Sequence, residues 1–151
     1  MPEYIDKSQF STRKPQIVAE DLPGEVWVPA FGYPNHEVSS LGRVRRRVDK
    51  TLIEGVQTRD GYRESELSKG KRIRFHRLVL QSFNPRDDWE DLTVDHINGI
   101  RSDNRLENLR WMSQEENTLA MLSRRVELQR ELTRLINKMG YEATLAALQA
   151  M

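Results

Sequence analysis

The sequence predicts an α+β fold: a β-rich N-terminal module, a strand–loop–strand–helix unit, and a C-terminal helical extension. Three observations lead to this class. Proline and glycine interrupt residues 23–42 so often that short strands and turns are favoured over helix. Two apolar stretches enclose a loop rich in Asn, Asp and Arg within residues 93–113. From Ser113 onward the sequence has the pattern of a capped helix.

The N-terminal part divides into two segments. Residues 1–21 are polar and aperiodic, which indicates a flexible arm, and residues 22–75 form the predicted β-rich module. Its strands are expected at 37–39 and 43–45, around a turn at Gly42, and at 51–53, 64–68 and 71–75. In "KRIRF" the period of two places Arg72 and Arg74 on one face, opposite Ile73 and Phe75.

The central unit spans residues 76–120. "HRLVLQSF" predicts a short apolar helix that ends at Asn84-Pro85. A strand at 93–97 follows, with its turn at Asn98-Gly99, and "LRWMS" predicts a second strand. Ser113 and Glu116 have capping-box spacing, so a helix should begin there with Asn117 in its first turn or just beyond.

Residues 121–151 form the predicted helical extension. We expect the helix to continue to Met139, Gly140 to end it, and "YEATLAALQAM" to form a last short helix. Leu128, Leu132 and Leu135 form an apolar stripe with Met139. This stripe could pack against its own domain, pair with a second copy, or belong to a helix–turn–helix around Gly140; packing ranks first.

The net charge of +1 conceals a segregation of charge along the chain. Residues 43–86 hold 13 Lys and Arg against 5 Asp and Glu, whereas residues 87–117 hold 3 against 9. A basic block beside an acidic block suggests a polyanion-binding surface next to a cation-binding one. The alternative is solubility charge that happens to cluster.

Composition excludes several classes of protein. The chain has no cysteine, which excludes disulfides and thiolate zinc sites, and its three histidines are too few for a His-rich metal cage. No apolar run approaches the roughly 18 residues of a membrane span, and the N-terminus has no apolar signal core. We therefore expect no membrane partner and a cytoplasmic location, in the host cell if a phage encodes the protein.

Asp95, His96 and Asn117 form the candidate site. A hairpin packed on a helix can bring them together, and a carboxylate with an amide oxygen suits Mg²⁺, which leaves its other positions to water and phosphate. A neutral His96 could take a proton from water, and the hydroxide would attack phosphorus. Because neighbouring strand residues face opposite sides, Asp95 and His96 can flank one phosphate only if the strand twists or the phosphate crosses its edge.

The span from "FHRLVLQSF" through "VDHINGIRSDNRLENLRWMSQEEN" resembles the HNH nucleases of phages and introns, which have the ββα-metal fold. Upstream, "HEVSSLGRVRR" and "GYRESELSKGKRIRFHRLV" resemble the small DNA-associated module that precedes this domain in homing endonucleases. The resemblance covers roughly residues 24–120. The chain departs from many of these proteins in lacking CxxC pairs, and "AFGYPNHEVSS" matches the upstream pattern only in part.

The resemblance implies a metal-dependent endonuclease that hydrolyses a phosphodiester in double-stranded DNA, as a nick or a double-strand break. One divalent cation, Mg²⁺ or Mn²⁺, would be held by Asp95 and Asn117, with no structural zinc. His96 would be the general base. Asn108, the middle letter of H-N-H, would complete the catalytic set by bracing the loop and helping to orient the strand of His96.

Arginines beside this motif are expected to contact DNA, mainly by neutralising phosphates; the alternative is a solvated face. The expected contacts are Arg43, Arg45, Arg46, Arg47, Arg72 and Arg74 in the module, with Arg101 and Arg105 in the loop. For the two loop arginines the alternative is a salt bridge to Asp103 or Glu107.

Two other functions compete with a homing-type endonuclease. The chain could be a catalytically silent DNA-binding or regulatory protein that kept the fold, or a nonspecific phage nuclease acting in DNA packaging or degradation. The intact Asp95, His96 and Asn117 argue against the silent protein. A monomer and a homodimer are both compatible with the sequence.

Overall fold

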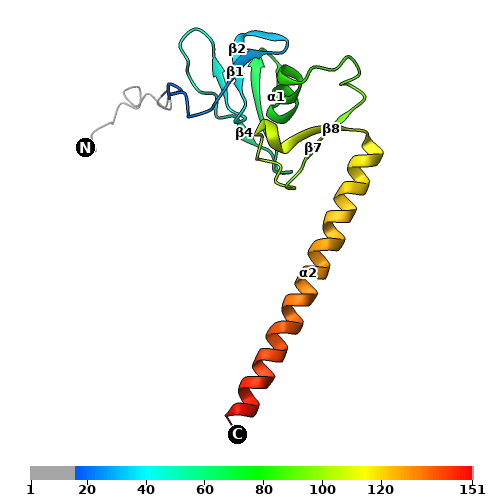
Figure 1. The fold of residues 1–151 in the computed structure, drawn as a ribbon. Helices are drawn as coiled ribbons and strands as arrows, with labels where there is room; N and C mark the ends of the chain where they lie inside the picture. The colour runs from blue at the N-terminus through cyan, green and yellow to red at the C-terminus, as the bar shows by residue number, and fades with distance from the viewer. Residues whose placement is uncertain (1–15, 151) are drawn as a thin grey trace, which may run out of the picture.

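The computed structural model describes residues 16–150, apart from the side chains of residues 144 and 147, and has the predicted α+β architecture. Small antiparallel sheets surround helix α1 (Phe75–Phe83), and helix α2 (Gln114–Gln149) projects away from them (Figure 1). Most of the predicted arm, residues 1–15, lies outside the described part.

Two three-stranded sheets build the N-terminal module. The first has the order β1 (Trp27–Ala30), β2 (Tyr33–Ser39), β3 (Val44–Arg46), and the second β4 (Val56–Gln57), β5 (Arg63–Ser68), β6 (Lys71–Arg74). The strands expected around Gly42 and at 64–68 are confirmed. The strand expected at 51–53 is reduced to isolated bridges from Thr51 to Val18 and from Leu52 to Arg45, because the chain changes pairing partner between these two residues.

Residues 17–21 differ from the expected free arm, because they lie against the module. The Ala19 amide donates to the Lys50 carbonyl at 2.8 Å, and Ala19 is buried. The Asp21 carboxylate pairs with Arg45 at 2.6 Å.

One hydrophobic core joins the module to the central unit. That unit contains α1 and a hairpin of β7 (Thr93–His96) and β8 (Leu109–Met112), with a 3₁₀ turn, η2 (Leu106–Asn108), before β8. Val38 and Val44 from the first sheet lie in the same cluster as Val79 of α1 and Leu109 of β8. The core therefore continues across the predicted boundary at residues 75 and 76.

Helix α2 corrects the expectation for the C-terminal part. It begins with the predicted Ser113–Glu116 capping box and runs unbroken through Gly140, so the described chain has neither a helix end there nor a helix–turn–helix. A glycine inside a helix costs roughly 1 kcal/mol, and helix-favouring neighbours such as Met139 outweigh it. All described side chains after Arg124 are exposed, so the Leu128 stripe does not pack on its own domain. The ribbon of α2 extends away from the sheets (Figure 1). No described helix is apolar enough over its length to cross a membrane.

A buried ion pair fixes the turn between β2 and β3. The Glu25 side chain has no exposed surface and pairs with the Arg43 guanidinium. Burial would raise the pKa of Glu25, but hydrogen bonds from Arg43, Ser39 and the Leu22 amide outweigh it and lower the pKa to about 2. Glu25 is therefore ionised at neutral pH and holds Arg43 against the module.

Replacing Glu25 with Gln should destabilise the protein in a pH-dependent way. A folded-state pKa of about 2, below the ordinary 4.5, gives stability that is present above pH 4.5 and is lost as the pH falls towards 2. Urea denaturation at pH 7 should show a loss of about 2–3 kcal/mol in the free energy of unfolding. The difference between wild type and Glu25→Gln should shrink on acidification; a difference independent of pH would contradict this account.

Candidate active site

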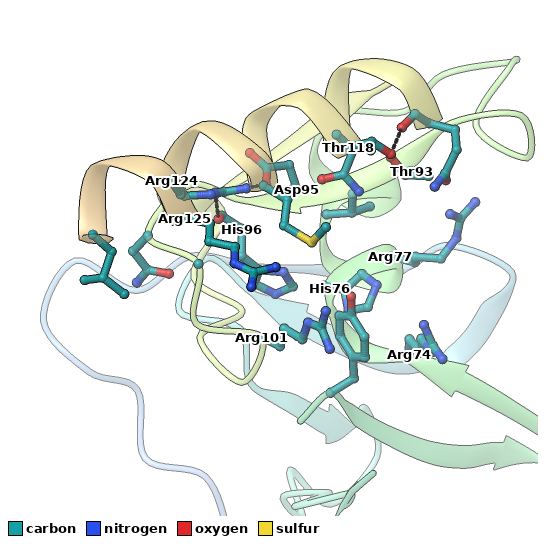
Figure 2. A pocket seen from close by; sticks show the side chains of 18 of the residues that line it. Arg74, His76, Arg77, Thr93, Asp95, His96, Arg101, Thr118, Arg124 and Arg125 are labelled. Atoms are coloured by element: carbon teal, nitrogen blue, oxygen red, sulfur yellow. Dashed lines mark hydrogen bonds and ion pairs between the residues drawn. The ribbon is translucent and has the colours of Figure 1, made fainter. Parts of the chain in front are cut away.

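The structure brings the three candidate residues to one open cleft of about 1000 Å³. Asp95 and His96 come from the end of β7, and Asn117 from the first turn of α2. His96 is the last residue of β7, next to the turn at Asn98–Gly99, and both it and Asp95 line the cleft despite being neighbours on a strand (Figure 2).

Asp95 is a buried carboxylate held by two arginines. Its side chain is 2% exposed, with Oδ1 accepting from Arg124 Nη2 at 2.6 Å and Oδ2 from Arg110 Nε at 2.9 Å. Burial would raise the pKa of Asp95, but the hydrogen bonds from Arg124 and Arg110 outweigh it and hold the pKa below its usual range. The carboxylate is therefore ionised at neutral pH.

His96 is a buried imidazole with one nitrogen engaged. Its Nε2 lies 3.3 Å from Asn104 Oδ1, and its backbone carbonyl accepts from Arg124 Nη1 at 2.6 Å. Burial lowers the pKa of His96 below 6.5, against the opposing effects of the Asn104 hydrogen bond and of Asp95. The ring is therefore neutral at neutral pH, and its Nδ1 has no hydrogen-bond partner among the described residues.

Asn108 ties the loop after β7 together. Its Oδ1 accepts from the Asn98 amide at 2.9 Å, and its Nδ2 donates to Asn98 Oδ1 at 3.0 Å and to the Asp103 carbonyl at 2.9 Å. The Ile97 amide donates to the Asn108 carbonyl at 2.9 Å, directly beside His96. These contacts suit the bracing role expected of Asn108, and they place its side chain in the loop rather than among the residues that line the cleft.

The donor set suits a hard divalent cation that the protein encloses only in part. Asp95 supplies a carboxylate, and the side-chain amide of Asn117, which lines the same cleft, makes no hydrogen bond to another described residue. The described part of the chain contains no cluster of three or more His, Asp or Glu side chains suited to a metal. Because Arg110 and Arg124 occupy both oxygens of Asp95, a cation would compete with a guanidinium for that carboxylate.

Three exposed arginines line the cleft without an ion pair to any described carboxylate: Arg74, Arg101 and Arg125. The guanidinium carbons of Arg74 and Arg101 lie 4.6 and 5.1 Å from the ring centre of Tyr62. Arg101 also donates to the Asp60 carbonyl at 2.9 Å. Figure 2 shows these arginines around His96, reaching the cleft from β6, the loop after β7 and α2. Their unpaired charge suits a phosphate.

The other expected DNA contacts are engaged within the protein to different degrees. The Arg45 side chain is 7% exposed, pairs with Asp21 and Glu37, and stacks on Trp27, so the structure does not present it to a ligand. Ion pairs also hold the more exposed arginines: Arg43 with Glu25, Arg46 with Asp49, Arg47 with Glu37 at 4.0 Å, Arg72 with Glu64, and Arg105 with Asp103 and Glu107. For Arg105 these are the salt bridges that formed the alternative interpretation.

A cluster of aromatic rings, from Tyr62, His76 and His96, lines the cleft. The rings of Tyr62 and His76 have centres 4.8 Å apart, and His76 meets His96 nearly edge-on at 5.2 Å. Burial, and then the positive charges of neighbouring groups, lower the pKa of His76 to about 3, so its ring is neutral. Tyr62 comes from the module, which therefore contributes directly to the cleft.

Several residues of this site were missed from the sequence: Tyr62, Asn104, Arg110, Arg124 and Arg125. Two of them carried a usable signal. Arg110 lies opposite Asp95 in the β7–β8 register, which follows once both strands are predicted. Arg124 lies two helical turns after Asn117 and so shares its face of α2. The positions of Tyr62 and Asn104 depend on how loops pack, and no periodic pattern in the sequence marks either residue.

Comparisons with known proteins point to one family. A family model described as HNH endonuclease matches residues 74–119. The uncharacterized HNH endonuclease L247 of Acanthamoeba polyphaga mimivirus is 36% identical over 101 residues, which are 62% of this chain and 25% of that protein. The DNA endonuclease I-HmuI of Bacillus phage SP01 is 37% identical over 103 residues, which are 65% of this chain and 58% of that protein.

A solved structure, described as DNA binding and cleavage by the HNH homing endonuclease I-HmuI, is similar in both sequence and fold. It matches with a TM-score of 0.59 and 30% sequence identity, over 74% of this chain and 68% of the solved chain. The chain thus spans about a quarter and somewhat more than half of the two curated relatives.

The two adjacent arginines of α2 should differ sharply in their effect on stability. Arg124→Ala removes one guanidinium from buried Asp95 and the donor to the His96 carbonyl, so the free energy of unfolding should fall by about 1–3 kcal/mol. Arg125→Ala removes an exposed, unpaired side chain and should change it by less than about 0.5 kcal/mol. Urea denaturation measures both, and equal effects would contradict the contacts described for Arg124.

Proposed function

We propose that this chain, which belongs to the HNH homing endonuclease family, hydrolyses phosphodiester bonds in double-stranded DNA with one divalent cation, Mg²⁺ or Mn²⁺. One observation carries the proposal: a neutral imidazole, His96, lies beside an ionised carboxylate, Asp95, in a cleft lined by unpaired arginines. A catalytically silent DNA-binding protein has no need for a buried base and a buried acid side by side.

His96 acts as the general base. Its neutral ring takes a proton from a water molecule in the cleft, and the water oxygen forms a bond to phosphorus. The bond from phosphorus to the 3′ oxygen breaks, and the departing oxygen takes a proton from solvent. Burial keeps His96 unprotonated at neutral pH, so the base is ready without a change in protonation.

Asp95 and Asn117 would hold the cation, and Asn108 would keep the loop beside His96 in place. The cation would supply positive charge against the non-bridging and departing oxygens of the phosphate. Asp95 offers a carboxylate that is already ionised, and its two arginines keep it in one orientation. Two protein oxygens are the usual extent of a protein's hold on Mg²⁺ when a phosphate provides the rest.

Arg74, Arg101 and Arg125 would bind the DNA backbone on either side of the reacting phosphate. Stacking on Tyr62 restricts Arg74 and Arg101, so less side-chain freedom is lost when a phosphate binds. Such contacts provide affinity and salt dependence rather than choice of sequence. Arg46 and Arg47, which are exposed although paired, would add weaker contacts along the module.

Cleavage should depend on His96 and on added metal. In a supercoiled-plasmid assay with Mg²⁺ or Mn²⁺, wild-type protein should give nicked or linear DNA, and EDTA should stop the reaction. His96→Ala should lower the cleavage rate by about 10²–10⁴-fold while DNA binding persists, because general-base catalysis contributes an effect of that size. His36→Ala serves as the control histidine and should cut normally. Wild-type protein that binds DNA but never cuts it would refute the proposed function.

Removal of one unpaired arginine should alter the salt dependence of DNA binding. Arg101→Ala should make the slope of log K against log salt shallower by about 1, because one phosphate contact is lost. Arg72→Ala should leave the slope nearly unchanged, since Glu64 already neutralises that guanidinium. Fluorescence anisotropy over a range of salt concentrations measures both, and identical slopes for Arg101→Ala and wild type would remove Arg101 from the DNA contacts.

A further inference from the structure

We propose that Asn104 is a positioning residue that fixes which nitrogen of His96 carries the proton. The proposal rests on the general-base function proposed for His96 and extends it to a residue with no assigned part. Asn104 Oδ1 lies 3.3 Å from His96 Nε2, and both residues are 4% exposed. Among the described residues, Asn104 is the hydrogen-bond partner of the His96 ring.

The chemistry of the pair determines the tautomer. An amide oxygen can only accept a hydrogen bond, so a neutral His96 facing Oδ1 must carry its proton on Nε2. The lone pair is then on Nδ1, the nitrogen with no described partner. Without the acceptor, the proton of the neutral ring could lie on either nitrogen. In the tautomer protonated on Nδ1, that nitrogen would have no lone pair with which to accept a proton from water.

The residues that precede and follow Asn104 in the loop are both held by hydrogen bonds. The carboxylate of Asp103, on one side, accepts from Asn98 Nδ2 at 2.8 Å and pairs with Arg105 at 2.8 Å. The Asp103 carbonyl accepts from Asn108 Nδ2. On the other side, the Leu106 amide donates to the Ser40 carbonyl at 2.8 Å, which ties the loop to the turn between β2 and β3.

The turn that contains Gly42 packs closely against Asn104. Gly42 has a φ of +79°, and a Cβ built there would lie 2.5 Å from both the carbonyl carbon and the carbonyl oxygen of Asn104. This close approach requires glycine at position 42, and it brings the turn between β2 and β3 directly against the backbone of Asn104. The N-terminal module thus packs against the residue that carries the acceptor.

The direct test is the tautomer of His96 in the full chain. ¹⁵N NMR of the ring nitrogens at neutral pH should show the proton on Nε2 in wild-type protein. A wild-type ring protonated mainly on Nδ1 would overturn the proposal, and this measurement needs neither a variant nor cleavage activity. Wild-type protein that shows the Nε2 tautomer but cuts no DNA would instead refute the proposed function.

Two substitutions separate positioning from packing. Asn104→Leu keeps much of the volume and removes the acceptor; the single-turnover cleavage rate should fall at least about tenfold, DNA affinity should change less than about twofold, and both tautomers should appear. Asn104→Asp restores an acceptor oxygen and should regain the Nε2 tautomer and most of the rate. Wild-type cleavage by Asn104→Leu, or no recovery by a folded Asn104→Asp, would overturn the proposal.

Gln81→Leu is the matched control. Gln81 is another 4% exposed amide, but it lies on α1 and bonds to the Arg86 backbone, away from the cleft. This variant should lose stability and keep both the His96 tautomer and the cleavage rate of the folded protein. A fall in rate equal to that of Asn104→Leu would show that loss of any buried amide suffices, and would overturn a specific role for Asn104.

Discussion

The arrangement of the site depends on one buried negative charge. Taking a carboxylate out of water is costly unless ionic and hydrogen-bonding partners replace the water. Asp95 finds them in Arg110 on the adjacent strand and Arg124 on α2, so one charge joins β7, β8 and the helix. Arg124 also bonds to the His96 carbonyl, so the partner of the acid also fixes the backbone of the base. The acid thus has a structural role that is present before any cation binds.

The hydrophobic core around α1 also determines how the site is arranged. Residues of the first sheet, of α1 and of the hairpin bury one another, so the module expected to grip DNA and the unit expected to cut it share a single interior. The module also supplies Tyr62 to the cleft and the turn at Gly42 that limits Asn104. The module and the central unit therefore form one packed body, and the turn between β2 and β3 contacts the active-site loop at Asn104.

Sequence reasoning succeeded where a local pattern fixes the structure. The capping box at Ser113, the β7–β8 hairpin and the short helix α1 each follow from a few neighbouring residues, and they bring Asp95, His96 and Asn117 to one cleft. It failed where the outcome depends on tertiary contacts. Gly140 has the sequence context of a helix end, yet α2 continues through it to Gln149.

The arginines show the same limit. Strand alternation placed several on exposed faces, but it could not reveal that Arg45 lies under Trp27 and between two carboxylates. Pairing decides which guanidiniums remain free for a ligand, and it joins residues far apart in the chain. Arg125 is a further case: helical periodicity places Arg124 on the face of Asn117, but no pattern in the sequence predicts that Arg125 also lines the cleft.

The Ser113 cap has a consequence for how this chain tolerates length changes. The cap sets the starting phase of α2, and each residue advances the helix by about 100°. An insertion or deletion of one residue between the cap and Arg124 would rotate every later side chain by that angle, swinging Arg124 off Asp95 while leaving the helix intact. Such an indel would disable the site more completely than most point substitutions, although the fold and the composition would hardly change.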